Sequence, residues 1–218
     1  MNFLITAGAT REPLDAVRFL SNASTGATGA ALGEALVAHG HSVTILRGEG
    51  AIVPRTAGTG EVFSSAADLC ARLQHRLGCG EFDAVLMAAA VADYRPERAI
   101  EGKIPSDAAE LTLALVRNEK ILPQLKRFSP RPLSVVGFKL TVGADESVRR
   151  RAVAAQFAEG GVDFVVHNDL TEIRTSAVHP FWLYRAPDKA PVKIEGAVAL
   201  AEALGKSLQT GPDRRPAR

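Results

Sequence analysis

The sequence has few cysteines and no long apolar run. Its two cysteines, Cys70 and Cys79, are too few for a disulfide framework, and neither has a second cysteine or a histidine at metal-ligand spacing. We therefore expect free thiols in a reducing compartment. The first ten residues, MNFLITAGAT, lack a basic segment followed by a long apolar stretch, so they predict no signal peptide. No apolar run approaches the roughly 20 residues that span a bilayer, and the expected location is cytoplasmic.

Histidine and an excess of one charge are also lacking. The chain has five histidines, and no two are placed to form a metal cage, so no metal site built by the protein is predicted. The 26 Lys and Arg residues nearly balance the 24 Asp and Glu residues, and the C-terminal stretch GPDRRPAR alone accounts for the net charge of +2. The rest of the chain is neutral, so the charge gives no reason to expect a nucleic-acid or membrane partner.

Alternating apolar strands and helices predict an α/β fold. Short apolar runs are typical of strands at 3–8, 41–48, 60–65, 133–140, 162–169 and 179–186, and another begins at Phe82. Helices are expected at 30–39 with Ser24 or Thr25 as the cap, from Ser65 or Ala66 to about Leu77, at 145–158 and at 196–208. We predict a Rossmann-like, mostly parallel sheet with helices on both faces, which binds ligands beyond the carboxyl ends of its strands.

Residues 95–118 interrupt this alternation. Within them, the stretch ELTLALV alternates like a strand with one exposed face. We expect an extended arm or flap, which either covers the active site or reaches a second copy of the chain. No linker or repeat divides the sequence, so residues 1–208 are predicted to form one domain, and the stretch 209–218, rich in proline and arginine, is predicted to be a disordered tail.

The stretch STGATGAALGEAL (24–36) is similar to the glycine-rich turn of dinucleotide-binding enzymes. That turn joins the first strand directly to the first helix, whereas here the strand ends at Gly8, sixteen residues before Ser24. The second strand ends in Leu46 and Arg47, where an NAD enzyme carries an acidic residue, and there is no Tyr-x-x-x-Lys pair. An NADP-dependent reductase is therefore a minor alternative. The long connection itself indicates a functional loop.

Five segments in order carry a more specific resemblance. ITAGATREPLDAVRFLSNASTGATG, AAAVADYRP, GKIPSD with LTLALVRNEKIL, VVGFKLT and VDFVVHND resemble the sequence blocks of the phosphopantothenate–cysteine ligase family, over about residues 2–170. The resemblance implies a ligase of coenzyme A biosynthesis. In that family 4′-phosphopantothenate attacks CTP or ATP, with Mg²⁺, to form an acyl nucleotidylate, and cysteine then displaces the nucleoside monophosphate. The flavin-dependent decarboxylase that is often fused to such ligases has no counterpart here, so no flavin is expected, and a separate decarboxylase is a possible partner. A homodimer is expected.

The resemblance also implies catalytic residues. Asn22 matches the catalytic asparagine, whose amide can stabilise developing negative charge on the acyl group. From the residues alone, a loop asparagine that caps the helix starting near Ser24 is the favoured interpretation. Arg18, on the same loop, can bind a phosphate or carboxylate, and Lys103 matches the first lysine of a mobile flap that neutralises the leaving pyrophosphate. Without the resemblance, both would be solvated surface residues.

The remaining expected site residues bind nucleotide or phosphate. These residues come from strand ends, the glycine-rich turn and the segment after the arm: Gly8, Thr10, Ser24, Thr25, Gly26, Ala88, Ala89, Asp93, Asn118, Ile121 and Phe138. Small residues let a nucleotide lie against the backbone, and Asp93 can accept hydrogen bonds from a ribose or a base. Phe138 can stack on the base, although an aromatic side chain near a strand end can also belong to the core.

The sequence departs from the family pattern at several cationic positions. Ala27, Gln156 and Gly160 stand where the family has lysines, and Ile104, Pro105 and Ser106 replace further flap lysines. Four cations could compensate: Lys139, Arg149, Arg150 and Arg151. Since each charge-assisted bond to a phosphate contributes about 1.5–3 kcal/mol, the losses keep a non-catalytic, nucleotide-binding relative open as an alternative. They also leave the choice between CTP and ATP open.

Overall fold

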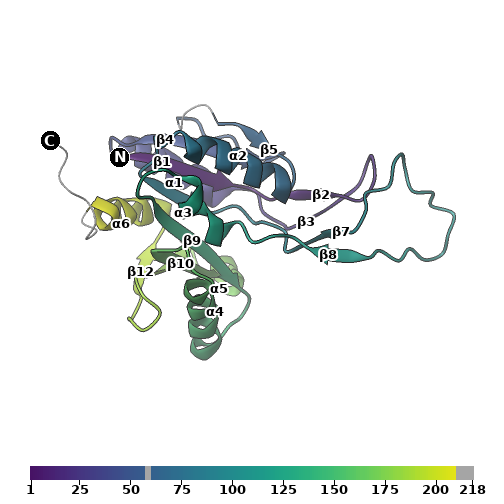
Figure 1. The fold of residues 1–218 in the computed structure, drawn as a ribbon. Helices are drawn as coiled ribbons and strands as arrows, with labels where there is room; N and C mark the ends of the chain where they lie inside the picture. Colours follow the sequence, from purple (N-terminus) through teal and green to yellow (C-terminus); the bar gives the residue numbers. More distant parts are fainter. Residues whose placement is uncertain (57–59, 210–218) are drawn as a thin grey trace.

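One twisted sheet organises the protein. The structure is a computed structural model that describes residues 1–56 and 60–209. In this part, six parallel strands follow the order β5-β4-β1-β6-β9-β10, and two antiparallel strands, β11 and β12, extend the edge beyond β10 (Figure 1). The strands are β1 (Asn2–Ala7), β4 (Ser42–Gly48), β5 (Val62–Phe63), β6 (Ala84–Met87), β9 (Ser134–Thr141), β10 (Phe164–Asp169), β11 (Pro180–Tyr184) and β12 (Val192–Glu195). The order reverses between β1 and β6, so the predicted Rossmann-like fold is confirmed.

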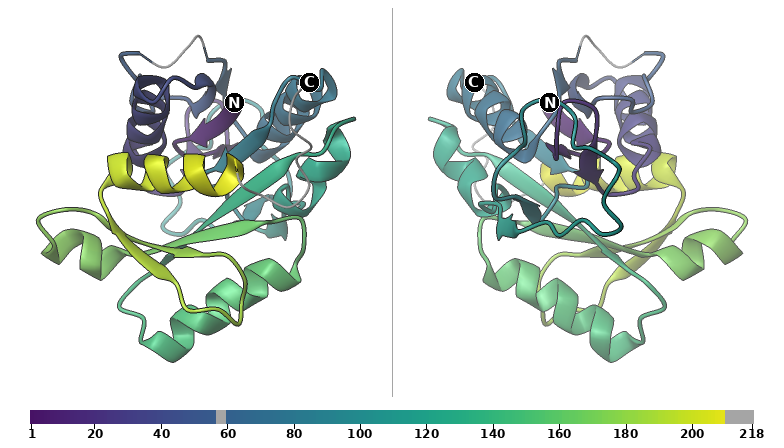
Figure 2. Two further views of the ribbon diagram at one scale, coloured as in Figure 1. Left: turned by 90° about the vertical axis from the view of Figure 1, so that its left-hand side faces the viewer. Right: turned by 90° about the vertical axis from the view of Figure 1, so that its right-hand side faces the viewer.

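Helices cover both faces of this sheet (Figure 2). Helices α1 (Ala27–Ala38) and α6 (Ala197–Gln209) pack on one face, and α2 (Ala66–Gly78), α3 (Leu125–Phe128) and α4 (Glu146–Ala158) pack on the other. Two further segments are short. The 3₁₀ turn η1 (Leu122–Gln124) follows the segment after β8, and helix α5 (Leu170–Thr175) directly follows the end of β10. None of the described helices is long and apolar enough to cross a membrane. Of the expected tail 209–218, only Gln209 is described, as the last residue of α6.

Two small hairpins project from the carboxyl edge of the sheet (Figure 1). One pairs β2 (Arg11–Pro13) with β3 (Phe19–Ser21), inside the connection that was expected to be a loop. The other pairs β7 (Tyr94–Pro96) with β8 (Leu115–Arg117), and residues 97–114 continue beyond it as an arm. The strand expected along ELTLALV is therefore wrong for residues 110–114: only Leu115 and Val116 of this stretch belong to β8, and the pairing continues beyond β7 only as one hydrogen bond from the Glu97 amide to the Ala114 carbonyl.

A buried carboxylate joins the two projections. Asp15, in the β2–β3 turn, accepts hydrogen bonds from the Arg18 guanidinium (2.5 and 2.9 Å) and from the amide of Ile104 on the arm (3.0 Å). Arg18 also donates to the carbonyl of Ile104 at 2.7 Å. The Arg18 guanidinium, followed by the Ile104 amide, holds the pKa of Asp15 well below its usual value. This arrangement, which we call the Asp15 clasp, fixes the arm on both sides of Lys103, since Gly102 also accepts a hydrogen bond from the β2–β3 turn.

Helix α1 begins directly against the end of β1. Gly26, the residue before the helix, has φ 76°, and a Cβ there would lie 2.9 Å from the backbone nitrogen of Gly8. The expected N-cap at Ser24 or Thr25 is wrong: Gly26 is the N-cap, although the amide of Ala27 donates to Thr25 Oγ1 at 3.4 Å. A positive φ and this close approach both require glycine, and the helix consequently starts at Ala27, earlier than expected.

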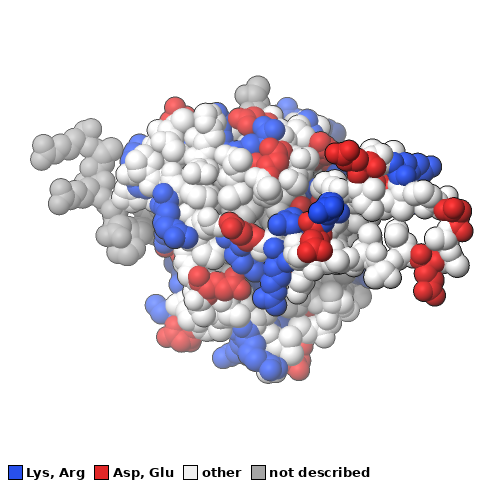
Figure 3. All heavy atoms as spheres, turned by 45° about the vertical axis from the view of Figure 1, so that its right-hand side comes forward, with Lys and Arg blue, Asp and Glu red and all other residues white. Residues whose placement is uncertain are grey.

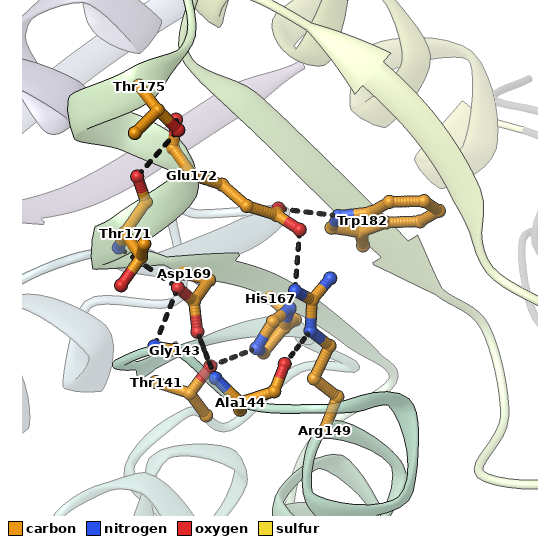
Figure 4. A network of polar contacts seen from close by, with 10 residues as sticks. All are labelled: Thr141, Gly143, Ala144, Arg149, His167, Asp169, Thr171, Glu172, Thr175 and Trp182. Carbon is orange, nitrogen blue, oxygen red and sulfur yellow. Dashed lines mark hydrogen bonds and ion pairs between the residues drawn. The ribbon is translucent and has the colours of Figure 1, made fainter.

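A second carboxylate fastens the ends of β9 and β10 (Figure 4). Asp169 accepts hydrogen bonds from Thr141 Oγ1 (2.7 Å) and from the amides of Gly143 (2.9 Å), Ala144 (3.0 Å) and Thr171 (2.9 Å). Burial is the largest effect and raises the pKa of Asp169, but the four hydrogen bonds together lower the pKa well below its usual value. Asp169 thus sets the path of the chain from β9 into α4 and from β10 into α5.

The close packing of α1 on β1 leads to a prediction for Gly29→Ala. A Cβ at Gly29 would lie 2.6 Å from the Cβ of Ala7, so the helix must shift away from the strand. We expect the free energy of unfolding, measured by urea denaturation, to fall by about 1–3 kcal/mol. Gly78→Ala is the control, because nothing lies within 4 Å of its added Cβ and alanine favours a helix. Equal stability of Gly29→Ala and the wild type would contradict the prediction.

The Asp169 contacts predict a loss of stability in Asp169→Asn. An amide nitrogen cannot accept a hydrogen bond, so at least one buried donor loses its partner, at a cost of about 1–3 kcal/mol at pH 7. Because the folded state lowers the pKa of Asp169, its contribution is present above the unfolded value of about 3.9 and is lost as the pH falls below it. Unfolding by urea at pH 7 and pH 3 should show the difference shrinking at pH 3. The exposed Asp188→Asn is the control, and a difference that does not depend on pH would count against this account.

Candidate functional site

The main cavity lies at the point where the strand order reverses. It measures about 780 Å³, and its walls come from the start of α1, the loop after β6, the segment after β8, the ends of β9 and β10, and α4. In doubly wound sheets, ligands bind in this crevice beyond the carboxyl ends of the strands. The cavity is large enough for a nucleotide-sized ligand.

Ten of the fourteen predicted site residues line this cavity. They come from three segments far apart in the sequence and from β9: Asn22, Ser24, Thr25, Gly26, Ala88, Ala89, Asp93, Asn118, Ile121 and Phe138. Phe138 also packs against the core under α1 and α6, so the side chain contributes to the core as well as to the cavity wall. The grouping supports a shared binding role, and the individual roles stay predictions.

Gly8 and Thr10 lie outside the cavity and hold its wall. The carbonyl of Gly8 accepts a hydrogen bond from the amide of Ala90 at 2.8 Å. Buried Thr10 accepts one through Oγ1 from the amide of Ala92 at 3.0 Å, and Thr6 Oγ1 accepts one from the amide of Ala89 at 3.1 Å. The continuation of β1 therefore positions the alanine loop after β6.

Arg18 and Lys103 do not line the cavity either. Arg18 lines a separate hollow of about 390 Å³ beside the β2–β3 hairpin, where it is held in the Asp15 clasp. Lys103 is exposed on the arm, and within the described part of the chain it forms no ion pair. The structure does not bring these two predicted catalytic residues together with Asn22.

The start of α1 offers backbone donors to the cavity. Ala27, Thr28 and Gly29 form the first turn of the helix and line the cavity. The first amides of a helix have no partner within the helix; here the amide of Ala27 donates to Thr25 Oγ1 at 3.4 Å, and no described side chain accepts from the amides of Thr28 and Gly29. Together with the helix dipole, these donors favour an anion such as a phosphate.

An ion pair closes one side of the cavity. Lys120 Nζ lies 2.6 Å from Asp93 Oδ1, and this hydrogen bond raises the pKa of Lys120. Asn118 donates through Nδ2 to the carbonyl of Ala92 at 2.9 Å and through its amide to the carbonyl of Asp93, which ties the segment after β8 to the loop after β6. Asp93 is therefore held in place, with its charge balanced by a lysine that the sequence did not single out.

The far end of the cavity holds a pair that sequence reasoning missed. Asn168 Nδ2 donates to His179 Nε2 at 3.0 Å, and the His179 ring stacks on Phe181 with centroids 4.0 Å apart. Burial lowers the pKa of His179, so its imidazole is neutral at pH 7. Because β11 runs antiparallel to β10, the residues before β11 meet the end of β10. That pairing was the signal that could have placed His179 here.

The four cations proposed as substitutes fall into two groups. Lys139 lines the cavity from the end of β9. Arg149 instead forms an ion pair with Glu172 at 2.5 Å, and Arg150 forms one with Glu146 at 2.6 Å (Figure 4 shows the first of these). Neither of them lines the cavity, and neither does Arg151. The three arginines of α4 therefore do not replace the missing lysines.

Gln156 occupies the position of one missing lysine and is buried against β9. Its Nε2 donates to the carbonyl of Phe138 at 3.3 Å, while its Oε1 has no hydrogen-bond partner. Across residues 1–56 and 60–209, no three His, Cys, Asp or Glu side chains gather in a way that could hold a metal ion.

Comparisons with known proteins identify related sequences and structures. Residues 1–182 match the sequence model of the "DNA/pantothenate metabolism flavoprotein C-terminal domain". The "Coenzyme A biosynthesis bifunctional protein CoaBC" of Thermococcus kodakarensis is 34% identical over 167 residues, which are 77% of this chain and 41% of that protein. The CoaBC protein of Mycolicibacterium smegmatis is 34% identical over 193 residues, 84% of this chain and 46% of that protein. The chain thus spans less than half the length of these two relatives.

Solved structures show the same fold. The DNA/pantothenate metabolism flavoprotein from Streptococcus pneumoniae superposes with a TM-score of 0.83 at 24% identity, covering 96% of this chain and 98% of that one. The C-terminal domain of a CoaBC protein gives 0.72 at 26% identity, covering 95% and 93%. A Cab2 H337A variant in complex with phosphopantothenate-cysteine gives 0.78 at 17% identity, covering 95% and 86%. The family match over residues 1–182 establishes that this chain belongs to the family of the DNA/pantothenate metabolism flavoprotein C-terminal domain.

Proposed function

We propose that this chain joins 4′-phosphopantothenate to L-cysteine in coenzyme A biosynthesis. The observation that carries the proposal is the cavity at the strand-order reversal, which collects Asn22, the open amides of α1, and the loop from Ala88 to Asp93. These residues match the family blocks, and the relatives named above are proteins of coenzyme A biosynthesis. The nucleotide consumed is CTP or ATP.

The reaction has two transfers. A carboxylate oxygen of 4′-phosphopantothenate attacks the α-phosphorus of the nucleotide, and the bond to pyrophosphate breaks. The amine of cysteine then attacks the acyl carbon, loses a proton, and displaces the nucleoside monophosphate. The first-turn amides of α1 bind phosphate oxygens, and the Asn22 amide donates to the acyl oxygen as negative charge develops on it. Mg²⁺ enters with the nucleotide as part of the substrate, because it keeps phosphate and water ligands and needs few carboxylates.

Lys103 and Arg18 need a further step to act. Both lie on the projecting hairpins outside the cavity, and the Asp15 clasp links their segments. They can reach a substrate when the arm closes over the cavity, or when the projections of one copy meet the cavity of a second copy. The cytoplasmic location and a separate decarboxylase that consumes the product stay predictions.

The proposal predicts pyrophosphate release that depends on Asn22. Purified protein should release pyrophosphate from CTP or ATP with 4′-phosphopantothenate, cysteine and Mg²⁺, and one of the two nucleotides should be preferred. Asn22→Ala should lower the rate by about 10²–10³-fold, as expected for the loss of an oxyanion donor. Asn22→Ala should also leave the unfolding curve unchanged, because Asn22 is exposed. Lys103→Ala should lower the rate as well.

The controls separate the ligase from its alternatives. Lys189→Ala, an exposed lysine outside the cavity, should retain the wild-type rate. Absence of release from folded wild-type protein with either nucleotide would overturn the ligase and favour a nucleotide-binding relative without catalysis. Binding of NADPH with a shift of its fluorescence would favour the reductase.

We also propose that the projections bind a second copy of the chain. Among the residues that the structure describes, half of the large exposed apolar side chains lie on these projections: Val17, Phe19, Leu20, Tyr94, Ile100, Leu111, Leu113 and Leu115. In Figure 3 the projecting part of the molecule shows uncharged surface between charged groups along its upper edge and at its tip. An exposed apolar surface of this kind is typical of a protein interface, and a second copy would cover the apolar side chains of both arms at once.

Light scattering after size exclusion tests the dimer. The wild type should have twice the 23.1 kDa mass of the chain. The double variant Leu111→Asp and Leu113→Asp should be monomeric, because charges would then be buried in the interface. Val192→Asp, an exposed position on the edge strand β12, is the control and should remain dimeric. A monomeric wild type at micromolar concentration would contradict the proposal.

A further inference from the structure

The charged residues of the cavity do not suit a polyanionic ligand at first sight. Five described charged residues line it: the carboxylates Asp93, Glu119 and Glu159 and the ammonium groups of Lys120 and Lys139. His179 adds no charge at pH 7, because burial lowers its pKa. Carboxylates therefore outnumber the lysines, whereas a nucleoside triphosphate needs cations beside its phosphates.

Only one of the two lysines is not already paired. Lys120 binds Asp93 at 2.6 Å, so its charge is largely balanced within the protein. Lys139 forms no ion pair with any described residue. The neighbouring arginines cannot take its place, since Arg149 and Arg150 bind carboxylates of their own outside the cavity.

The strand register places Lys139 where a ligand would lie. The pairing of β6 with β9 ends at Met87 and Gly137, so Lys139 lies two residues beyond the last pair. At that level β6 has given way to the loop that begins at Ala88. On its other side Lys139 is paired in register with His167 of β10, so the backbone that carries it is held in the sheet. A lysine fixed at its base and free at its ammonium suits a phosphate contact.

We propose that Lys139 binds a phosphate group of the nucleotide in this cavity. The proposal rests on the proposed function and names the residue that provides the charge absent at Ala27, Gln156 and Gly160. Phosphate oxygens would then be bound from two walls, by the first-turn amides of α1 and by the ammonium of Lys139. Lys120 keeps Asp93 neutralised, so that carboxylate does not repel the ligand.

Nucleotide binding by isothermal titration calorimetry tests the role of Lys139. The probes are CTP and ATP with Mg²⁺, inorganic pyrophosphate, and the nucleosides cytidine and adenosine. Lys139→Met keeps the length of the side chain and removes the charge. It should bind the preferred triphosphate and pyrophosphate about 10- to 100-fold more weakly and leave nucleoside binding within about twofold. Lys139→Arg should recover most of the affinity for the triphosphate.

The matched control is Lys126→Met, since Lys126 is an exposed lysine that pairs with Asp163 away from the cavity. It should bind all probes like the wild type. Should Lys139→Met fail to fold, as judged by thermal unfolding, Lys139→Gln takes its place. Equal losses for nucleoside and triphosphate, or no loss for either, would overturn the role of Lys139. If Lys139→Met still released pyrophosphate and bound the triphosphate as tightly as the wild type, the proposed function would stand and only the role of Lys139 would be overturned. A wild type that binds no triphosphate would overturn both.

Discussion

Gly8 and Gly26 meet backbone to backbone where β1 ends and α1 begins, and only hydrogen fits in place of a side chain at this contact. The contact determines where the helix starts and therefore where its first-turn amides point. It also positions the residues that continue β1, in which the Gly8 carbonyl and Thr10 Oγ1 accept hydrogen bonds from the loop after β6. Two walls of the cavity thus depend on one close approach. A Cβ on Gly26 would press on the backbone of Gly8, and a Cβ on Gly8 would press on Ala51 and Gly48, so both glycines matter although Gly8 lies outside the cavity.

Buried carboxylates organise the loops that this contact does not reach. Asp169 collects four donors at the ends of β9 and β10, and Asp15 collects the guanidinium and amides that join the arm to the β2–β3 turn. Both carboxylates have a lowered pKa because their hydrogen bonds favour the charged form. The cavity acid Asp93 differs, since it is exposed and is balanced by the exposed ammonium group of Lys120. Buried carboxylates therefore hold the loops through backbone amides, whereas the carboxylate of Asp93 at the cavity is paired with a side chain.

Much of the fold and part of the site could be predicted from the sequence, for local reasons. Short apolar runs, and the helix starts expected at Ser65 or Ala66 and at about residue 145, are short-range signals, and they correctly predicted the central strands and two helix starts. The site residues that cluster are those that follow strands, because parallel strands all end at one edge.

Positions that depend on long-range contacts were not predictable. The sequence showed Arg18 and Lys103 as family residues, but their separation from the cavity follows from the Asp15 clasp. Lys120 and His179 enter the site only through the β7–β8 hairpin and the antiparallel β11.

The distribution of donors in the cavity also bears on how the reaction can proceed. Fixed amides bind phosphate without the loss of side-chain entropy that a lysine incurs, and their partial charges do not need a counterion when the site is empty. A cavity with many lysines would bind the triphosphate tightly, but it would bind the product pyrophosphate almost as tightly. Under the proposed function, Lys139, the amides of α1 and incoming Mg²⁺ would share the neutralisation, and two of these three are either neutral or leave with the ligand. Tighter binding of the ground state does not accelerate a reaction. The loss of lysines at Ala27, Gln156 and Gly160 is therefore compatible with turnover, provided that the arm or a second copy brings Lys103 to the phosphates as pyrophosphate leaves.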